Sequence, residues 1–257
     1  MAQVIPVVNQ KGGVGKTTTT VNLSASLALK GLKVLVIDLD PQGNCSSSFG
    51  VDKDTLGAHA YHLLLGQASL PDVIYQSEIE TLHIIPTNMN LAGAEVELVT
   101  EMGREGRLAE ALHGHLDEYD LVFVDCPPSL GLITLNALTA ADGLIVPLQC
   151  EYFSLEGVSQ LLRTLELVQS RINPRVKLDG VVLTMFDRRN KLSFQVQTEV
   201  QNYFGDLLFE TPIPRNVRLS ESPSHGKPIS LYDRRSTGAI AYEALSKEVI
   251  KRLGLSV

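Results

Sequence analysis

The sequence predicts an α/β fold, a doubly wound and mostly parallel sheet with helices on both faces. Short runs of β-branched residues and leucine lack polar alternation, which is typical of strands buried on both faces. Helical patterns separate these runs along the chain, as the connections of a parallel sheet require. No internal repeat, low-complexity tract or Pro/Gly/Ser-rich linker interrupts the alternation, so residues 1–257 are expected to form one domain.

The expected strands, in chain order, are Val4–Val8, Val34–Ile37, Leu82–Ile85, Leu121–Val124, Leu144–Val146 and Val181–Thr184. The expected helices are Thr17–Lys30, Arg104–Leu116, Ser154–Arg171, Ser193–Phe204 and Thr237–Leu253, the last stopping at Gly254. Ligands in such sheets bind beyond the carboxyl ends of the strands, near the point where strand order reverses. Three motifs follow such ends, after Val8, Ile37 and Val124.

Composition narrows the class of protein. Apolar residues make up 44% of the chain, enough for a sizeable core, and aromatic residues only 5%, which disfavours a base-stacking surface for single-stranded nucleic acid. Cys45, Cys126 and Cys150 are widely spaced without a C-x-x-C pair, so neither a zinc site nor a disulfide framework is indicated, and a reducing cytoplasm fits. No signal peptide or membrane-spanning run is visible, so membrane insertion is not expected.

Charge is divided unevenly along the chain. The net charge is −7, which by itself argues against a nucleic-acid partner. Residues 163–235, however, hold 12 of the 22 Lys/Arg and only 8 of the 29 Asp/Glu. This local excess is consistent either with a nucleic-acid surface or with an ordinary solvated face.

A glycine-rich run follows the first strand and opens the first helix. Its glycines allow a tight turn whose N–H groups approach a polyphosphate, and the helix adds its N-terminal dipole. Lys16 is expected to pair with the β- and γ-phosphates of ATP, and the Thr17 hydroxyl to ligate Mg²⁺. The cradle is expected to consist of Lys11, Gly12, Gly13, Val14, Gly15, Lys16, Thr17 and Thr18.

The run departs from the general pattern G-x-x-x-x-G-K-[ST] at its start, where Gln10 replaces glycine and Lys11 follows. A second lysine at the lip of a phosphate loop is not needed to bind phosphate within one chain. It could instead reach a partner's nucleotide across a dimer interface and stabilise transition-state charge, as an arginine finger does. The alternative is that Lys11 is merely solvated.

Three carboxylates terminate the second and fourth expected strands. Asp38 and Asp40 are two residues apart, so on extended chain both side chains face the same side, toward the phosphate. One of them could hold the Mg²⁺ shell and the other orient or deprotonate the attacking water. Asp125 ends an apolar strand in the manner of a Walker B residue, although a lone strand-terminal Asp is often a helix cap.

Together these residues resemble the ParA/Soj family of partition ATPases, a P-loop NTPase family with a deviant (SIMIBI-type) Walker A motif whose signature lysine corresponds to Lys11. The resemblance covers nearly the whole chain. Beyond the phosphate loop it rests on residues 38–44, 125–129, 151–157, 183–187, 213–220 and 223–228. Because the first strand begins near Met1, the chain resembles the short chromosomal type, without a preceding helix-turn-helix domain.

The resemblance implies an ATP-dependent sandwich homodimer, non-specific binding of double-stranded DNA and hydrolysis to ADP stimulated by a ParB-like partner. It implies a cytoplasmic, nucleoid-associated protein. By family pattern Lys11, Lys16 and Asp40 are catalytic, and Thr17 ligates Mg²⁺. The strand-terminal carboxylates Asp38 and Asp125 are expected to complete the metal site. The nucleotide contacts beyond the loop are Met185, Pro214, Arg215 and Asn216. The implied DNA contacts are Arg189 and Arg218, and adjacent Arg188 leaves open which arginine of that pair meets the backbone.

Two other functions compete. A MinD-like membrane-surface ATPase needs an amphipathic C-terminal anchor, but residues 241–253 contain two glutamates among three basic residues and no Phe or Trp, which favours a docked helix. A metabolic relative would need a second substrate pocket for ligase chemistry, or a cysteine meeting its symmetry mate for electron transfer. Cys126 is better interpreted as a small buried residue than as such a cysteine.

Overall fold

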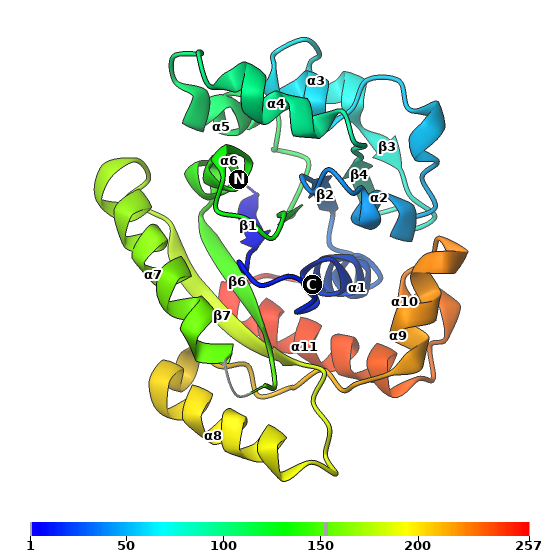
Figure 1. Cartoon of the computed structure of the whole chain (residues 1–257). Helices are drawn as coiled ribbons and strands as arrows, with labels where there is room; N and C mark the ends of the chain where they lie inside the picture. Colours follow the sequence, from blue (N-terminus) through cyan, green and yellow to red (C-terminus); the bar gives the residue numbers. More distant parts are fainter. Residues whose placement is uncertain (1, 152–153, 257) are drawn as a thin grey trace.

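The computed structural model describes residues 2–151 and 154–256. Seven strands form one sheet in the order β3-β4-β2-β5-β1-β6-β7 (Figure 1). Their bounds are β1 Gln3–Val7, β2 Val34–Asp38, β3 Tyr75–Gln76, β4 Leu82–Ile85, β5 Leu121–Asp125, β6 Gly143–Gln149 and β7 Lys177–Thr184. All neighbouring pairs are parallel except β3 with β4. The predicted fold class is confirmed, and β3 is an edge strand that the sequence did not reveal.

Strand β1 sits between β5 and β6, so the chain reverses its direction of travel across the sheet at this point. The three strands β2, β5 and β1 are adjacent, and the register pairs Asp38 with Asp125 and Asp125 with Val7. The carboxyl ends that carry the three sequence motifs therefore meet at one edge of the sheet, where a ligand site is expected.

Helices cover both faces of the sheet (Figure 1). Their bounds are α1 Lys16–Ala28, α2 Asn44–Ser48, α3 Ala60–Leu64, α4 Leu91–Leu98, α5 Arg107–Leu112, α6 Leu132–Ala140, α7 Ser154–Arg171, α8 Lys191–Phe204, α9 Val217–Glu221, α10 Ile229–Tyr232 and α11 Thr237–Leu253. Side chains of α3 to α8 share a buried cluster with one face of the sheet. Those of α1, α10 and α11 share a second cluster with the other face.

Two helices, Ser154–Arg171 and Thr237–Leu253, have the bounds predicted from the sequence, and Gly254 adopts the left-handed conformation of a helix stop. The prediction of one helix over Arg104–Leu116 is wrong. A 3-10 turn over residues 104–106 precedes α5, which ends at Leu112. The helix stops early because His113 is extended and Gly114 has a φ of 76°.

The C-terminal helix α11 is docked, as the sequence favoured. It packs along α1, and its residues Tyr242, Leu245 and Val249 are buried in the second cluster. The Tyr242 hydroxyl hydrogen-bonds Thr19 of α1 at 3.2 Å. Among the described residues, no helix has the length and apolarity needed to cross a membrane.

Candidate active site

The loop between β1 and α1 surrounds a cavity of about 260 Å³. Gly13 and Gly15 have φ values of 74° and 89°, which glycine adopts without strain, and α1 begins directly after Gly15. The Asn9 amide anchors the base of the loop, since it donates to the Pro147 carbonyl at 2.7 Å and accepts from the Lys11 N–H at 3.0 Å. The cavity is lined by Gly12, Gly13, Gly15, Lys16, Thr17, Thr18, Asp40, Asn44, Pro128 and Met185.

Lys16 is 7% exposed and lines this cavity. Its ammonium donates to the Lys11 carbonyl at 3.2 Å, which closes the loop on itself. Burial lowers the pKa of Lys16, and the nearby Asp125 and Asp40 oppose that shift. A buried ammonium held at the mouth of a helix N-terminus is a site for phosphate.

Asp125 is fully buried behind Thr17. The Thr17 hydroxyl donates to one carboxylate oxygen at 2.7 Å and the Thr20 hydroxyl to the other at 3.2 Å. Burial, and then the neighbouring Asp38, raise the pKa of Asp125 well above its usual range. Asp125 is thus no helix cap, because its hydrogen bonds go to the hydroxyls of α1 beneath the phosphate cavity.

The structure separates the two carboxylates that the sequence placed on one side. Asp38 is fully buried; it accepts the Ser46 N–H and hydroxyl at 2.8 and 2.7 Å, and the Asp40 N–H at 3.1 Å. Burial raises the pKa of Asp38 to about 7. Asp40, rather than Asp38, is among the described residues that line the cavity. Strand β2 ends at Asp38, so side-chain alternation does not extend to Asp40.

The oxygen atoms around Thr17 suit a hard cation whose remaining ligands are phosphate oxygens and water. Across the described chain, no cluster of three or more His, Cys, Asp or Glu residues is arranged to hold a metal by itself. Mg²⁺ does not need such a cluster, because it keeps several waters and binds through one or two protein oxygens plus substrate phosphates. A hydroxyl with two buried carboxylates behind it matches that preference, and the residues present therefore fit Mg²⁺.

A second cavity, of about 280 Å³, adjoins the first and shares Gly15, Thr18 and Met185 with it. It is lined further by Pro214, Arg215 and Asn216, which the family resemblance assigns to nucleotide contacts. A parallel bridge holds the segments together: Phe186 N donates to the Ile213 carbonyl, and Arg215 N to the Phe186 carbonyl. A polar phosphate cavity that opens into a more apolar one is the shape a nucleotide requires.

Met185 connects the two cavities in an unusual conformation. Its φ of 52° is the one positive value among the non-glycine residues that the structure describes. Such backbone strain concentrates at ligand sites. Thr184, one residue earlier, holds β7 against the phosphate loop by donating to the Val14 carbonyl at 2.8 Å.

Several cavity residues were missed by the sequence analysis, namely Asn44, Pro128, Thr184, Ile213, Leu219, Ser220, Pro223 and Tyr242. Thr184 could have been found, because it ends the expected strand Val181–Thr184 and carboxyl strand ends form the site. Tyr242 could not, since it lies in the middle of α11 and reaches the cavity only through helix packing.

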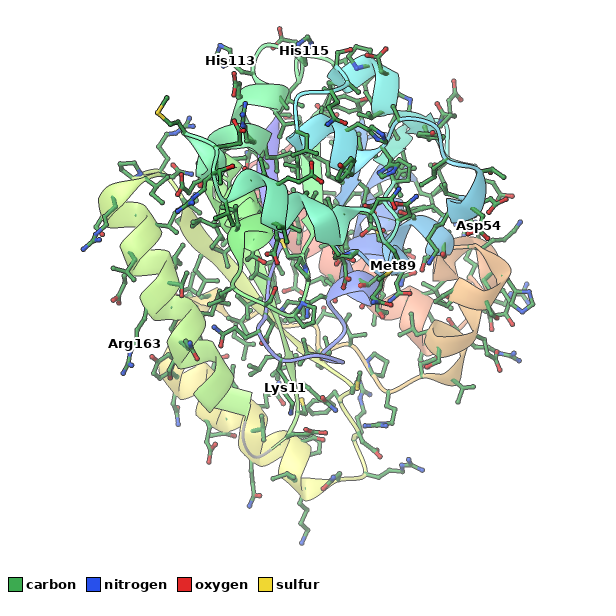
Figure 2. All side chains as sticks on the ribbon, turned by 45° about the horizontal axis from the view of Figure 1, so that its top comes forward. Lys11, Asp54, Met89, His113, His115 and Arg163 are labelled. Carbon is green, nitrogen blue, oxygen red and sulfur yellow. The ribbon has the colours of Figure 1, made fainter. Side chains whose placement is uncertain are left out.

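Lys11 lies on the rim of the loop, where Figure 2 shows it at the protein surface. Its ammonium forms an ion pair of 2.7 Å with Glu151, and the two side chains are 42% and 49% exposed. The interpretation of Lys11 as merely solvated is therefore incomplete, because the lysine is held within its own chain. Of the segment 151–157, Tyr152 and Phe153 lie outside the described residues.

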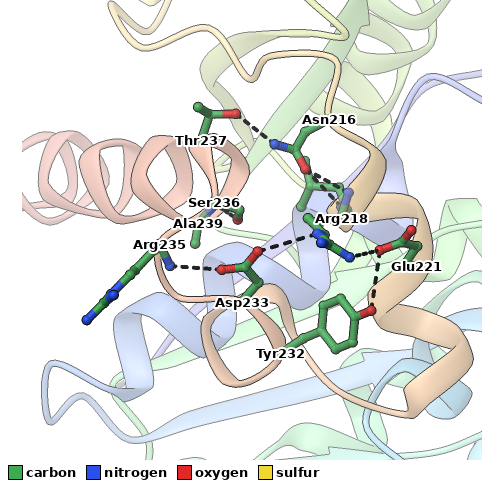
Figure 3. Close-up of polar contacts among 10 residues, drawn as sticks. Asn216, Arg218, Glu221, Tyr232, Asp233, Arg235, Ser236, Thr237 and Ala239 are labelled. Carbon is green, nitrogen blue, oxygen red and sulfur yellow. Dashed lines mark hydrogen bonds and ion pairs between the residues drawn. The ribbon is translucent and has the colours of Figure 1, made fainter.

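Both arginines assigned to DNA are engaged in ion pairs. Figure 3 shows Arg218 between Glu221, at 2.7 Å, and Asp233, at 3.5 Å. Arg189 makes two hydrogen bonds to Asp187, at 3.0 and 3.1 Å, although its side chain is 90% exposed. A phosphate would have to compete with these carboxylates for either guanidinium.

Comparison with known proteins identifies the family. A family model described as an AAA domain matches residues 2–178. The sporulation initiation inhibitor protein Soj of Bacillus subtilis is 53% identical over 97% of this chain and 98% of its own length. The chromosome partitioning protein ParA of Myxococcus xanthus is 50% identical over 98% of this chain and 89% of its own. The chain belongs to the ParA/Soj family of chromosome-partitioning ATPases.

Solved structures place other proteins on the same ParA/Soj-like fold. A Mycobacterium smegmatis protein named cobyrinic acid a,c-diamide synthase, with bound ATP analogue and magnesium, is 39% identical with a TM-score of 0.87, covering 99% of this chain and 96% of its own. The septum site-determining protein MinD of Pyrococcus horikoshii, complexed with Mg-ADP, is 27% identical with a TM-score of 0.80, covering 99% and 98%. Nucleotide and magnesium thus accompany this fold in both neighbours.

Proposed function

We propose that this ParA/Soj-family chain is an ATP-dependent DNA-segregation ATPase, which binds ATP and Mg²⁺ and hydrolyses ATP to ADP and phosphate. The observation that carries the proposal is the pair of joined cavities at the switch point of the sheet, one polar and bordered by Lys16, the other more apolar. The polar cavity takes the polyphosphate on the loop from Lys11 to Thr18. The second takes the base, against Met185, Pro214, Arg215 and Asn216.

Mg²⁺, when bound with the nucleotide, supplies a Lewis acid that neutralises charge on the phosphate oxygens. Thr17 is the residue that would hold it. Asp125 and Asp38 would support the metal site from the protein interior. There Asp125 accepts a hydrogen bond from the Thr17 hydroxyl and Asp38 accepts one from the Ser46 hydroxyl. Asp40 lines the cavity and serves as the group that orients or deprotonates the attacking water.

In the proposed mechanism Lys11 acts across a homodimer interface, toward the partner's nucleotide, where it stabilises transition-state charge. To do so it must leave Glu151. An exposed ion pair contributes at most about 1 kcal/mol, so a phosphate with several negative charges displaces this carboxylate readily.

We further propose that the ATP-bound dimer binds double-stranded DNA without sequence preference, through the region that includes Arg189 and Arg218, and that a ParB-like partner stimulates hydrolysis and so releases DNA. The protein would then be cytoplasmic and nucleoid-associated. The proposal is supported by the family and by the basic excess of residues 163–235. A MinD-like role is less well supported, because the buried face of α11 is used in packing against α1.

The deciding experiment is co-sedimentation of the protein with DNA in ATP, in ADP and without nucleotide, with phosphate release measured in parallel. DNA binding that requires ATP, together with phosphate release, supports the proposal. Binding that is equal in all three conditions, or an absence of phosphate release, contradicts it. Vesicles of anionic lipid in place of DNA test the MinD-like alternative, which requires ATP-dependent lipid binding.

A further inference from the structure

A third cavity, of about 380 Å³, lies between α1, α2 and the 3-10 turn Ser222–His225. We call it the serine cavity, after three serines that are not among the described residues lining the other two cavities. The residues that line it are Thr17, Thr18, Val21, Asn22, Asn44, Ser47, Ser48, Ser222 and Pro223.

The serine cavity adjoins both parts of the proposed nucleotide site. It shares Thr17, Thr18 and Asn44 with the phosphate cavity, and Thr18 and Pro223 with the cavity proposed for the base. Among the described residues, Thr18 alone lines all three cavities. A nucleotide with its phosphates in one cavity and its base in the next must place its sugar between them, and therefore close to Thr18.

The serine cavity is polar but uncharged. None of the described residues that line it is Lys, Arg, His, Asp or Glu, and all except Val21 and Pro223 carry a hydroxyl or an amide. A phosphate is a poor occupant, because the charge compensation that Lys16 offers in the phosphate cavity has no counterpart here. A neutral ligand rich in hydroxyl groups matches this lining, and a sugar is such a ligand.

One side chain of the serine cavity is buried without a partner. The Ser48 hydroxyl donates to the Asn44 carbonyl at 2.7 Å, and the Asn22 amide donates to the Thr18 carbonyl at 2.8 Å. Ser222, by contrast, is 2% exposed, and its hydroxyl forms no hydrogen bond within the described chain. A buried hydroxyl without a partner is unfavourable, and a ligand that supplies one removes that cost.

The turn that carries Ser222 is held against both helices. Next to α2, the backbones of Gly50 and Gly226 approach so closely that a Cβ on Gly226 would lie 2.8 Å from the Gly50 Cα. Next to α1, the Ile229 N–H donates to the Asn22 side-chain oxygen at 2.7 Å. Ser222 is therefore positioned in the wall of the cavity before a ligand arrives, which lowers the entropic cost of binding.

We propose that the serine cavity receives the ribose of the bound nucleotide and that Ser222 hydrogen-bonds a ribose hydroxyl, so that the chain distinguishes ribonucleotides from deoxyribonucleotides. The assignment rests on the proposed nucleotide-binding function. A site that binds a substrate hydroxyl through a buried polar group rejects the analogue lacking that hydroxyl, because the protein group is then left unpaired.

The test is isothermal titration calorimetry with ADP, 2′-deoxy-ADP and 3′-deoxy-ADP in the presence of Mg²⁺. Diphosphates are used because they are not consumed by ATP hydrolysis during the titration. The wild type is compared with Ser222→Ala and with a matched control, Ser224→Ala. Ser224 lies in the same turn but is exposed, and its hydroxyl donates to the Glu221 carbonyl at 2.7 Å. Thermal melting of each variant confirms that it is folded.

We expect the wild type to bind at least one of the two deoxynucleotides about fivefold more weakly than ADP, the effect of one hydrogen bond. Ser222→Ala should bind ADP about fivefold more weakly and that deoxynucleotide as the wild type does, so that the preference disappears. Ser224→Ala should keep it. Equal affinity of the wild type for all three nucleotides, or an unchanged preference in Ser222→Ala, overturns the proposal. An equal loss for all three in Ser222→Ala also overturns it, because such a loss indicates a purely structural serine.

Failure of the sugar assignment differs from failure of the proposed function. A chain that binds all three nucleotides equally retains the nucleotide site and loses the sugar assignment. A chain that prefers ribose through Ser222 but releases no phosphate from ATP contradicts the proposed ATPase activity and retains the sugar assignment. A chain that binds none of the three nucleotides contradicts both.

Discussion

A buried lysine and two buried carboxylates lie beneath the phosphate cavity, and the pKa of one carboxylate, Asp125, is affected by both Lys16 and Asp38. Lys16 loses solvation by burial, and the negative charges of Asp125 and Asp40 partly restore its protonated form. Asp125 in turn lies next to Asp38 across the β2–β5 ladder, and both carry a raised pKa. In the absence of ligand this cluster is electrostatically unfavourable, which is the condition under which a cation such as Mg²⁺ gains most from binding.

Lys16→Ala should weaken ATP binding by roughly 100-fold or more, because it removes the ammonium that borders the phosphate cavity. Isothermal titration calorimetry measures the change. Lys30→Ala, two residues beyond the C-terminal end of α1, is the matched control and should bind ATP as the wild type does. Near-normal affinity in Lys16→Ala would contradict the assignment of the phosphate cradle.

Asp40→Ala should still bind ATP and dimerise but hydrolyse ATP about 100-fold or more slowly, since it loses the carboxylate that acts on the attacking water. Phosphate release measures turnover, and gel filtration with ATP should show a trapped dimer. Asp54→Ala, an exposed carboxylate in the same region of the chain, is the control. Unchanged turnover in Asp40→Ala would move the role to Asp38 or Asp125.

Asp38 makes the ligand-free protein sensitive to pH. Its pKa is about 7 in the folded chain and near 3.8 when unfolded, so between these values the native state binds more protons than the unfolded state. The stability that the protonated Asp38 provides is therefore lost as pH rises through 7. With EDTA and no nucleotide, the melting temperature should fall by about 3 °C or more from pH 5 to pH 8. A fall just as steep in Asp38→Asn would assign the effect to other groups.

At the scale of the element, the site is an assembly of strand ends and loops, and this explains what the sequence could reveal. The phosphate loop and Asp125 were predictable because strand, glycine run and helix are contiguous in sequence. The buried position of Asp38 could not be predicted, because it depends on a hydrogen bond from Ser46. That serine lies in α2, a five-residue helix without a sequence pattern of its own. Strand β3, two residues long and antiparallel, was missed for the same reason.

The loops after β1 and β6 are joined by the Lys11–Glu151 ion pair, and this contact predicts opposite effects of two substitutions. Lys11→Ala should bind ATP within its own chain but fail to form the sandwich dimer. Glu151→Gln frees the lysine and should strengthen ATP-dependent dimerisation by up to about fivefold, the effect of one exposed pair. Sedimentation with ATP measures both. A Lys11→Ala dimer, or weaker dimerisation of Glu151→Gln, would contradict the cross-interface role.

At the scale of the whole molecule, charge is segregated. The acidic stretch of residues 54–103 and the basic excess of residues 163–235 are separate in sequence. Local sequence reasoning detected the basic segment, but it could not show that Arg189 and Arg218 each have a carboxylate partner. Those partners, Asp187 and Glu221, lie two and three residues away and are recognised only when side-chain positions are known.

Arg189→Ala and Arg218→Ala should each weaken DNA binding uniformly across sequences and lower the salt dependence by about one unit of slope, while basal ATPase persists. Arg188→Ala decides between the adjacent arginines. Glu221→Gln should strengthen binding, because it removes a carboxylate that competes with phosphate for Arg218. Filter binding on two unrelated duplexes at two salt concentrations measures these effects. Wild-type affinity in both alanine variants, or a strong preference for one duplex, would place the DNA surface elsewhere.

The strand order also dictates when the protein can fold during its synthesis. The first strand pairs with β5 and β6 alone, and β2 shares β5 as a neighbour, so neither can complete its place in the sheet until residues 121–149 have been made. The hydrogen bond from Thr17 to Asp125 likewise cannot form until Asp125 has been synthesised. For the first half of translation the nascent chain therefore holds unpaired apolar strands, the state in which chaperones bind. The phosphate loop leaves the ribosome first yet matures late, so nucleotide can stabilise only chains that are more than half complete.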